Sequence, residues 1–194
     1  MKQIILLSGK KRSGKSLSGL LLKQIDPSVK LLAFAGPLKQ IIADTFRIDL
    51  QELDDLKNSG HTVLHGVPPE DQHGTNFRMQ TYREILQNFG TEGMKPIFGE
   101  TVWADVAVKF IKHMLTVSDT VVLTDWRFTQ ELDVIQDNFP DYTIKTVRVT
   151  REGLELFDGH SSEIDLDDCN FDYVVPNNGT LEELKLKLEG ILNG

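Results

Sequence analysis

The 194-residue sequence has one cysteine, two tryptophans and no long hydrophobic run. Cys169 on its own excludes an internal disulfide, and a single thiolate is too few for a structural zinc or iron–sulfur site. The apolar run from Ile4 to Leu7 is far too short to cross a bilayer, and it lacks the small-residue cleavage pattern of a signal peptide. We therefore expect a protein of the reducing cytoplasm.

An excess of positive charge is also missing. The 21 Lys and Arg residues are outnumbered by 29 Asp and Glu residues, which gives a formal net charge of −8. Because this overall charge repels nucleic acid and anionic membranes, we expect neither among the partners. A phosphate ligand would need a local group of cations. The sequence has one such group, made of Lys10, Lys11, Arg12 and Lys15.

Short apolar runs alternate with longer amphipathic stretches, without an internal repeat or low-complexity run. The pattern predicts strands at 3–8, 30–35, 120–124, 142–149 and 171–175, and helices at 16–25, 36–46, 82–89, 102–115, 128–138 and 181–192. We expect the helix that starts at Tyr82 to break at Gly90. Strands separated by helices predict an α/β fold, in which helices flank a central parallel five-stranded sheet. The length suits a single domain over residues 1–194.

Residues 49–80 depart from this alternation. They are mostly polar and include Pro68, Pro69 and three histidines. A stretch of this length without apolar periodicity predicts an irregular, flexible insertion.

Residues 9–16, Gly-Lys-Lys-Arg-Ser-Gly-Lys-Ser, match G-x-x-x-x-G-K-[ST] at every fixed position. The two glycines allow a turn that points backbone N–H groups inward, and the following helix N-terminus adds positive potential. Lys15 would reach the β- and γ-phosphates of an NTP, and Ser16 would offer a hydroxyl to Mg²⁺. A glycine-rich turn without a ligand is the alternative, but the strand–loop–helix context favours an NTP site. The predicted ATP-binding residues are Gly9, Lys10, Lys11, Arg12, Ser13, Gly14, Lys15 and Ser16.

The residues after the strand at 120–124 bear on the class of P-loop protein. Asp125 resembles a Walker B carboxylate, but Trp126 follows it where many ATP hydrolases have glutamate, and no Asn-Lys-x-Asp sequence is present for reading guanine. Neither class of hydrolase is therefore favoured. Arg127 lies at the carboxyl end of a central strand, where ligands bind in open α/β sheets, and Glu131 follows one helical turn later. A surface ion pair between Asp125 and Arg127 is the alternative interpretation.

Further stretches extend this pattern along most of the chain. They are Phe34 to Lys39, Arg83 to Glu92, Trp103, Thr124 to Phe128 with Glu131, Arg148 to Arg151, His160 to Glu163 and Asn177 to Thr180. Together with the P-loop, they make the sequence resemble the bacteriophage deoxynucleoside monophosphate kinases, a branch of the P-loop nucleotide and nucleoside kinases. The most diagnostic stretches are Leu-Gln-x-x-Gly-Thr-Glu at 86–92 and Asp-x-Arg-x-x-x-Glu at 125–131.

This resemblance implies transfer of the γ-phosphoryl group of ATP to a deoxynucleoside monophosphate (dNMP), with Mg²⁺ as cofactor. It implies a P-loop kinase fold in which 49–80 binds the monophosphate and 152–165 forms a short lid. The residues that it makes catalytic are Lys15, Arg127 and Arg151, and those that it assigns to the metal are Ser16 and Asp125. The residues that it places around the acceptor are Lys39, Arg83, Gln87, Thr91, Trp103, Asp125, Arg127 and Glu131.

Other interpretations stay open at this point. A kinase acting on phosphomevalonate or dephospho-coenzyme A would share the P-loop and the acidic strand end, and a regulatory module could bind ATP without turnover. Trp103 could equally be an apolar core residue on its helix, without a role in substrate binding. The sequence does not decide between a monomer and a homodimer.

Overall fold

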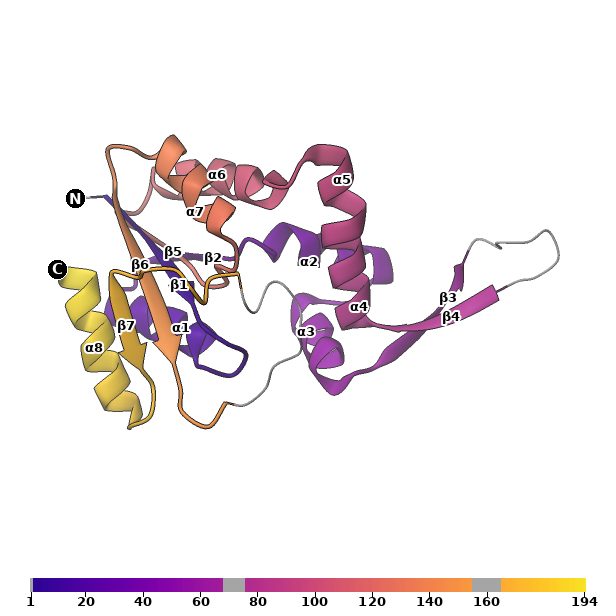
Figure 1. The fold of residues 1–194 in the computed structure, drawn as a ribbon, viewed down its shortest axis with the longest axis horizontal. Coiled ribbons are helices and arrows are strands. Elements are labelled where there is room, and N and C mark those ends of the chain that lie inside the picture. The colour runs from indigo at the N-terminus through magenta and orange to yellow at the C-terminus, as the bar shows by residue number, and fades with distance from the viewer. Residues whose placement is uncertain (1, 68–75, 155–164) are drawn as a thin grey trace. The chain divides into compact units, whose positions relative to one another are not determined.

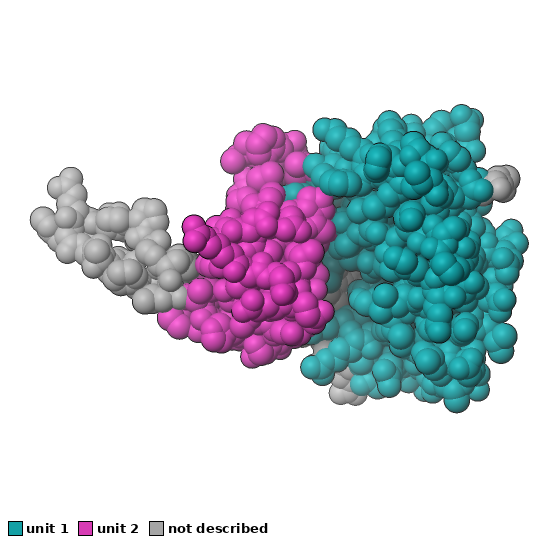
Figure 2. All heavy atoms as spheres, turned by 180° about the vertical axis from the view of Figure 1, so that it is seen from behind, with its two compact units in different colours: residues 1–34, 103–194 teal, residues 35–102 magenta. Residues whose placement is uncertain are grey.

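The computed structural model describes residues 2–67, 76–154 and 165–194. The chain divides into two compact units, which Figure 2 shows in different colours. Unit 1 consists of Met1–Phe34 with Trp103–Gly194, and unit 2 consists of Ala35–Val102. Within the described ranges, no helix combines the length and the apolar character that a membrane crossing requires.

Unit 1 is built on a five-stranded sheet with the order β2-β5-β1-β6-β7, in which every pairing is parallel (Figure 1). Its strands are β1 (Gln3–Ser8), β2 (Lys30–Leu32), β5 (Thr120–Leu123), β6 (Thr143–Thr150) and β7 (Tyr173–Pro176). Its helices are α1 (Lys15–Ile25), α6 (Val102–Met114), α7 (Thr129–Asn138) and α8 (Leu181–Asn193). The predicted α/β fold with a parallel five-stranded sheet is thus confirmed.

The central strand β1 serves two cores, because both of its faces are apolar. Ile4 and Leu6 pack into one cluster with residues of α6 and α7, whereas Ile5 and Leu7 pack into another with residues of α1 and α8. Successive side chains of a strand point to opposite faces of the sheet. The helices therefore form one layer on each face, and the carboxyl ends of β1 and β5 lie side by side (Figure 1).

Unit 2 is mainly helical. Its elements are α2 (Gly36–Phe46), α3 (Leu50–Ser59), β3 (Thr62–Val67), β4 (Asn76–Thr81), α4 (Tyr82–Gln87), the π-helical segment η1 (Asn88–Met94) and α5 (Lys95–Phe98). Strands β3 and β4 pair antiparallel as a separate two-stranded sheet.

The predicted irregular structure of residues 49–80 is wrong for the part that the structure describes, which forms α3, β3 and β4. Leu53 is the one buried residue of α3, so the helix has little apolar periodicity to reveal it. The sequence nevertheless contains the residues that typically begin and end a helix. The Asp49 side chain accepts a hydrogen bond from the Glu52 N–H at 2.8 Å, and Gly60 ends the helix with φ at +73°.

The predicted helix break at Gly90 is also wrong. The chain stays helical from α4 through η1 into α5. A Cβ on Gly90 would lie 2.7 Å from Cδ2 of Leu38. Glycine is therefore needed here for the close approach of α2, and not for a turn.

Candidate nucleotide-binding site

The loop between β1 and α1 has the backbone that its motif predicts. Gly9 and Gly14 have φ angles of +152° and +106°, which residues with a Cβ rarely adopt. A Cβ on Gly9 would lie 2.3 Å from the Val149 carbonyl oxygen, and a Cβ on Gly14 would lie 2.3 Å from Nδ2 of Asn177. Conformation and space therefore both require glycine at the two positions.

Asn177 supports the loop from the end of β7. Its side-chain Nδ2 donates to the Ser13 carbonyl oxygen at 2.9 Å, while its backbone N–H donates to the Thr150 carbonyl at 2.7 Å. Within the loop, Lys15 Nζ donates to the Gly9 carbonyl. Asn177 thus ties the loop to the sheet, a role that no spacing rule in the sequence indicates.

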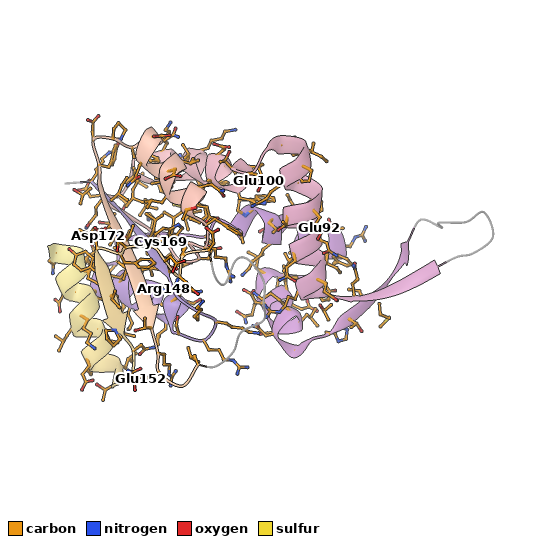
Figure 3. All side chains as sticks on the ribbon, in the orientation of Figure 1. Glu92, Glu100, Arg148, Glu152, Cys169 and Asp172 are labelled. Atoms are coloured by element: carbon orange, nitrogen blue, oxygen red, sulfur yellow. The ribbon has the colours of Figure 1, made fainter. Side chains whose placement is uncertain are left out.

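Asp167 provides a second support for the loop. Its carboxylate pairs with Lys10 Nζ through one oxygen and accepts from Arg148 Nη2 at 2.6 Å through the other. Arg148, which Figure 3 labels on β6, also donates from Nη1 to Ser8 Oγ at 2.9 Å. Lys10 is therefore held by a carboxylate from the segment that precedes β7, a contact between residues distant in sequence.

The end of β5 lies beside the loop, because β5 pairs with β1. Oδ1 of Asp125 accepts from the Phe34 N–H at 2.7 Å, and the Trp126 N–H donates to the Leu7 carbonyl at 3.1 Å. These bonds fix the backbone on both sides of Asp125. The partly buried Arg127 follows at the same edge of the sheet.

Glu131 closes the turn that leads from β5 into α7. Its Oε2 atom accepts from the backbone N–H of Arg127 at 2.9 Å and from that of Phe128 at 3.1 Å. Burial raises the pKa of Glu131 to about 8, and the nearby Asp125 carboxylate adds to the rise, although the two backbone donors and the charge of Arg127 oppose it. Glu131 therefore organises the backbone around Arg127.

The residues assigned to the metal fit Mg²⁺ in their chemistry. Ser16 offers a hydroxyl oxygen from the first turn of α1, and Asp125 offers a carboxylate oxygen from the adjacent strand end. Mg²⁺ prefers such oxygen ligands, and it usually binds through one or two protein groups together with substrate phosphates. The described residues contain no cluster of three or more His, Cys, Asp or Glu side chains suited to a metal.

The residues expected around the acceptor fall into both units. Lys39 on α2, Arg83 and Gln87 on α4, and Thr91 on η1 all lie in unit 2. Arg83 and Gln87 are four residues apart and share one face of α4. Trp103 lies on α6 in unit 1 and is partly buried.

Most of the lid expected at 152–165 lies outside the described residues, which resume at Asp165. Arg151 directly follows β6 and is exposed. Oδ2 of Asp165 accepts from the Thr129 N–H at 2.8 Å. The chain is therefore fixed to the start of α7 where the described part begins again.

The parallel sheet, the phosphate-type loop after β1 and the aspartate after the neighbouring strand define an α/β protein of the P-loop fold. Among solved structures, the chain is similar in fold to TT1252 from Thermus thermophilus, with a TM-score of 0.50 and 18% identity over 99% of this chain and 97% of that one. The APS kinase CysC from Mycobacterium tuberculosis matches with a TM-score of 0.45 and 10% identity, over 100% of this chain and 98% of that one.

Residues 70–188 match the family model described as deoxynucleotide monophosphate kinase, and the chain belongs to that family. A relative, the deoxynucleotide monophosphate kinase of Escherichia phage RB69, is 30% identical over 111 residues. These residues make up 57% of this chain and 44% of the phage protein, so the match spans less than half of the relative. The P-loop at 9–16 precedes the residues that the family model matches, and its assignment rests on its own geometry.

Proposed function

We propose that this protein transfers the γ-phosphoryl group of ATP to a deoxynucleoside monophosphate, giving ADP and a deoxynucleoside diphosphate. The observation that carries the proposal is a P-loop of the expected conformation on a chain of the deoxynucleotide monophosphate kinase family. The fold alone would support many phosphate chemistries. Family membership narrows the acceptor to a nucleoside monophosphate.

In this reaction the backbone N–H groups of the loop and Lys15 bind the ATP phosphates. Ser16 and Asp125 would hold Mg²⁺, which would neutralise part of the charge on the phosphate oxygens. Arg127 would stabilise the charge that develops on the transferred group, while Glu131 keeps the backbone of Arg127 in place. Arg151 would add a second arginine from the base of the lid.

On the acceptor side, the residues that would bind the monophosphate are Lys39, Arg83, Gln87, Thr91 and Trp103. We place the reaction in the cytoplasm, with ATP and dNMP as partners and without a nucleic-acid polymer or a membrane. The net charge of −8 supports the exclusion of polyanionic partners. A homodimer is compatible with this function.

The experiment that tests the proposed function is an ADP-release assay with each of the four dNMPs and the four matching NMPs. Turnover that depends on a nucleoside monophosphate supports it. Turnover with phosphomevalonate or dephospho-coenzyme A alone would assign a different kinase. Bound ATP that no monophosphate causes to be consumed would indicate a regulatory module.

We expect dNMPs to be preferred over the matching NMPs by about 5- to 150-fold in kcat/KM. A 2′-hydroxyl pressed against a tight apolar surface loses hydration worth about 1–3 kcal/mol. Trp103 is the candidate for that surface, since Tyr82, the other large side chain near the acceptor residues in sequence, is only 5% exposed and packs edge-on against Phe46. Trp103→Ala should therefore reduce the preference in the same assay. Equal efficiency with dGMP and GMP in the wild type would contradict deoxyribose selectivity.

A further inference from the structure

Three helices of unit 2 bring a group of charged side chains together around Asp54. Lys39 on α2 donates from Nζ to both carboxylate oxygens of Asp54, at 2.8 and 3.0 Å. Lys57, which is one turn after Asp54 on α3, donates from Nζ to Oδ1 at 2.7 Å. Arg83 on α4 is close enough to Lys57 to act on its charge. Two ammonium groups therefore share one carboxylate, with a guanidinium nearby.

The group lies at the surface of unit 2 but is not fully hydrated. The side chains of Lys39, Lys57 and Asp54 are 27%, 22% and 36% exposed. Burial lowers the pKa of Lys57, and the charges of Lys39 and Arg83 lower it further, although the contact with Asp54 opposes both effects. The packing of unit 2 thus holds the Lys57 ammonium group close to other cations, where its positive charge is disfavoured.

The charges of this group do not balance. Among these four side chains, Asp54 carries one negative charge, whereas Lys39, Lys57 and Arg83 carry three positive charges. A phosphate monoester carries a charge between about −1.5 and −2 at neutral pH and has three strong acceptor oxygens. It would complete the group in both charge and hydrogen bonding.

We propose that Lys57 binds the 5′-phosphate of the nucleoside monophosphate, together with Lys39 and Arg83, and that Asp54 is a positioning residue that holds the two lysines side by side in the free protein. This inference rests on the proposed function, from which it takes the acceptor. Neither Asp54 nor Lys57 belongs to a sequence motif that marks the site. Their contribution follows from the packing of α2, α3 and α4.

The first test is a set of variants assayed for KM with both substrates. Lys57→Met should raise the KM for the dNMP about tenfold or more and leave the KM for ATP unchanged, because it removes one charge-assisted hydrogen bond to phosphate. Lys57→Arg keeps the charge and should stay within about threefold of the wild type. Lys112→Met, the same substitution on α6, serves as the control and should change neither KM. An unchanged KM for the dNMP in Lys57→Met would overturn the proposal.

The Asp54→Asn variant distinguishes positioning of the two lysines by Asp54 from a simple electrostatic attraction between the group and the phosphate. The substitution adds one net positive charge, which on its own would strengthen binding of a dianion. If Asp54 positions the lysines, the KM for the dNMP should instead rise several-fold, because the two ammonium groups then repel each other. A lower KM in Asp54→Asn would contradict the positioning role.

The second test needs no variant, and it uses the wild-type chain with an amine-modifying reagent at limiting concentration. Peptide mapping should show that dGMP protects Lys57 several-fold, while the matching nucleoside, deoxyguanosine, does not. Equal modification of Lys57 with and without dGMP would overturn the inference. Protection without any phosphoryl transfer would instead leave the phosphate site standing and refute the proposed function.

Discussion

Lys15→Ala is expected to lower kcat by about 10²-fold or more while the fold stays intact. Lys15 lies at the start of α1 and donates to the Gly9 carbonyl within the loop. In the reaction its ammonium group would act on charge that develops between the β- and γ-phosphates, so its loss removes stabilisation mainly from the transition state. Steady-state kinetics with ATP and a dNMP measure the effect, and circular dichroism checks the fold.

Arg127→Ala should cause a loss of similar size, since Arg127 lies at the strand end next to the loop. Arg127→Lys keeps the charge but not the forked geometry and should recover only part of the rate. Lys23→Ala removes an exposed lysine from α1 and is the control for Lys15. Folded Lys15→Ala with wild-type turnover would refute the assignment of the loop.

Glu131→Gln is expected to stabilise the protein relative to the wild type, and increasingly so as the pH rises. The pKa of Glu131 is about 8 in the folded chain, against an ordinary value of 4.5 for a glutamate in water. Between these values the unfolded chain loses the proton and the folded chain keeps it, so the wild type loses about 1.4 kcal/mol of stability per pH unit. Glutamine keeps an oxygen that can accept from Arg127 and Phe128, but it does not ionise.

The free energy of unfolding should be measured by urea denaturation at pH 5 and pH 8, in the presence of EDTA. The difference in the free energy of unfolding between Glu131→Gln and the wild type should grow by up to about 4 kcal/mol from pH 5 to pH 8, in favour of the variant. Glu183→Gln is a matched control, because Glu183 also accepts a backbone N–H, from Thr180 at the start of α8, but is exposed to water. A constant gap for Glu131→Gln would show that the buried carboxyl ionises as freely as an exposed one.

The parts of the molecule that follow local rules were predictable from the sequence. The apolar run at 120–124 predicts a parallel strand buried on both faces, and β5 is such a strand, with four buried residues. Gly9 and Gly14 predict the conformation of the loop, since few other residues allow those φ angles. Thr180 marks the start of α8 by accepting from the Glu183 N–H.

Contacts between distant segments were not predictable in this way. Asn177 donates a hydrogen bond to Ser13, more than a hundred residues earlier in the chain. Asp54 on α3 accepts a hydrogen bond from Lys39 on α2. Glycine often ends a helix, and Gly90 therefore predicts a helix break. In the structure, the close approach of Leu38 explains why glycine is needed at this position. In each case the contact is made by a residue that is distant in sequence and is brought close by the packing of the fold, so a single sequence does not reveal it.

Unit 2 is a single uninterrupted stretch of the chain, from Ala35 to Val102, between two parts of unit 1. All the charged groups around Asp54 are encoded within it, while the loop, Asp125 and Arg127 are encoded outside it. Evolution can therefore lengthen, shorten or exchange this stretch in one genetic event without altering the strand order of the sheet. A lineage of such proteins could change the charged residues of unit 2 while inheriting the loop after β1 unchanged.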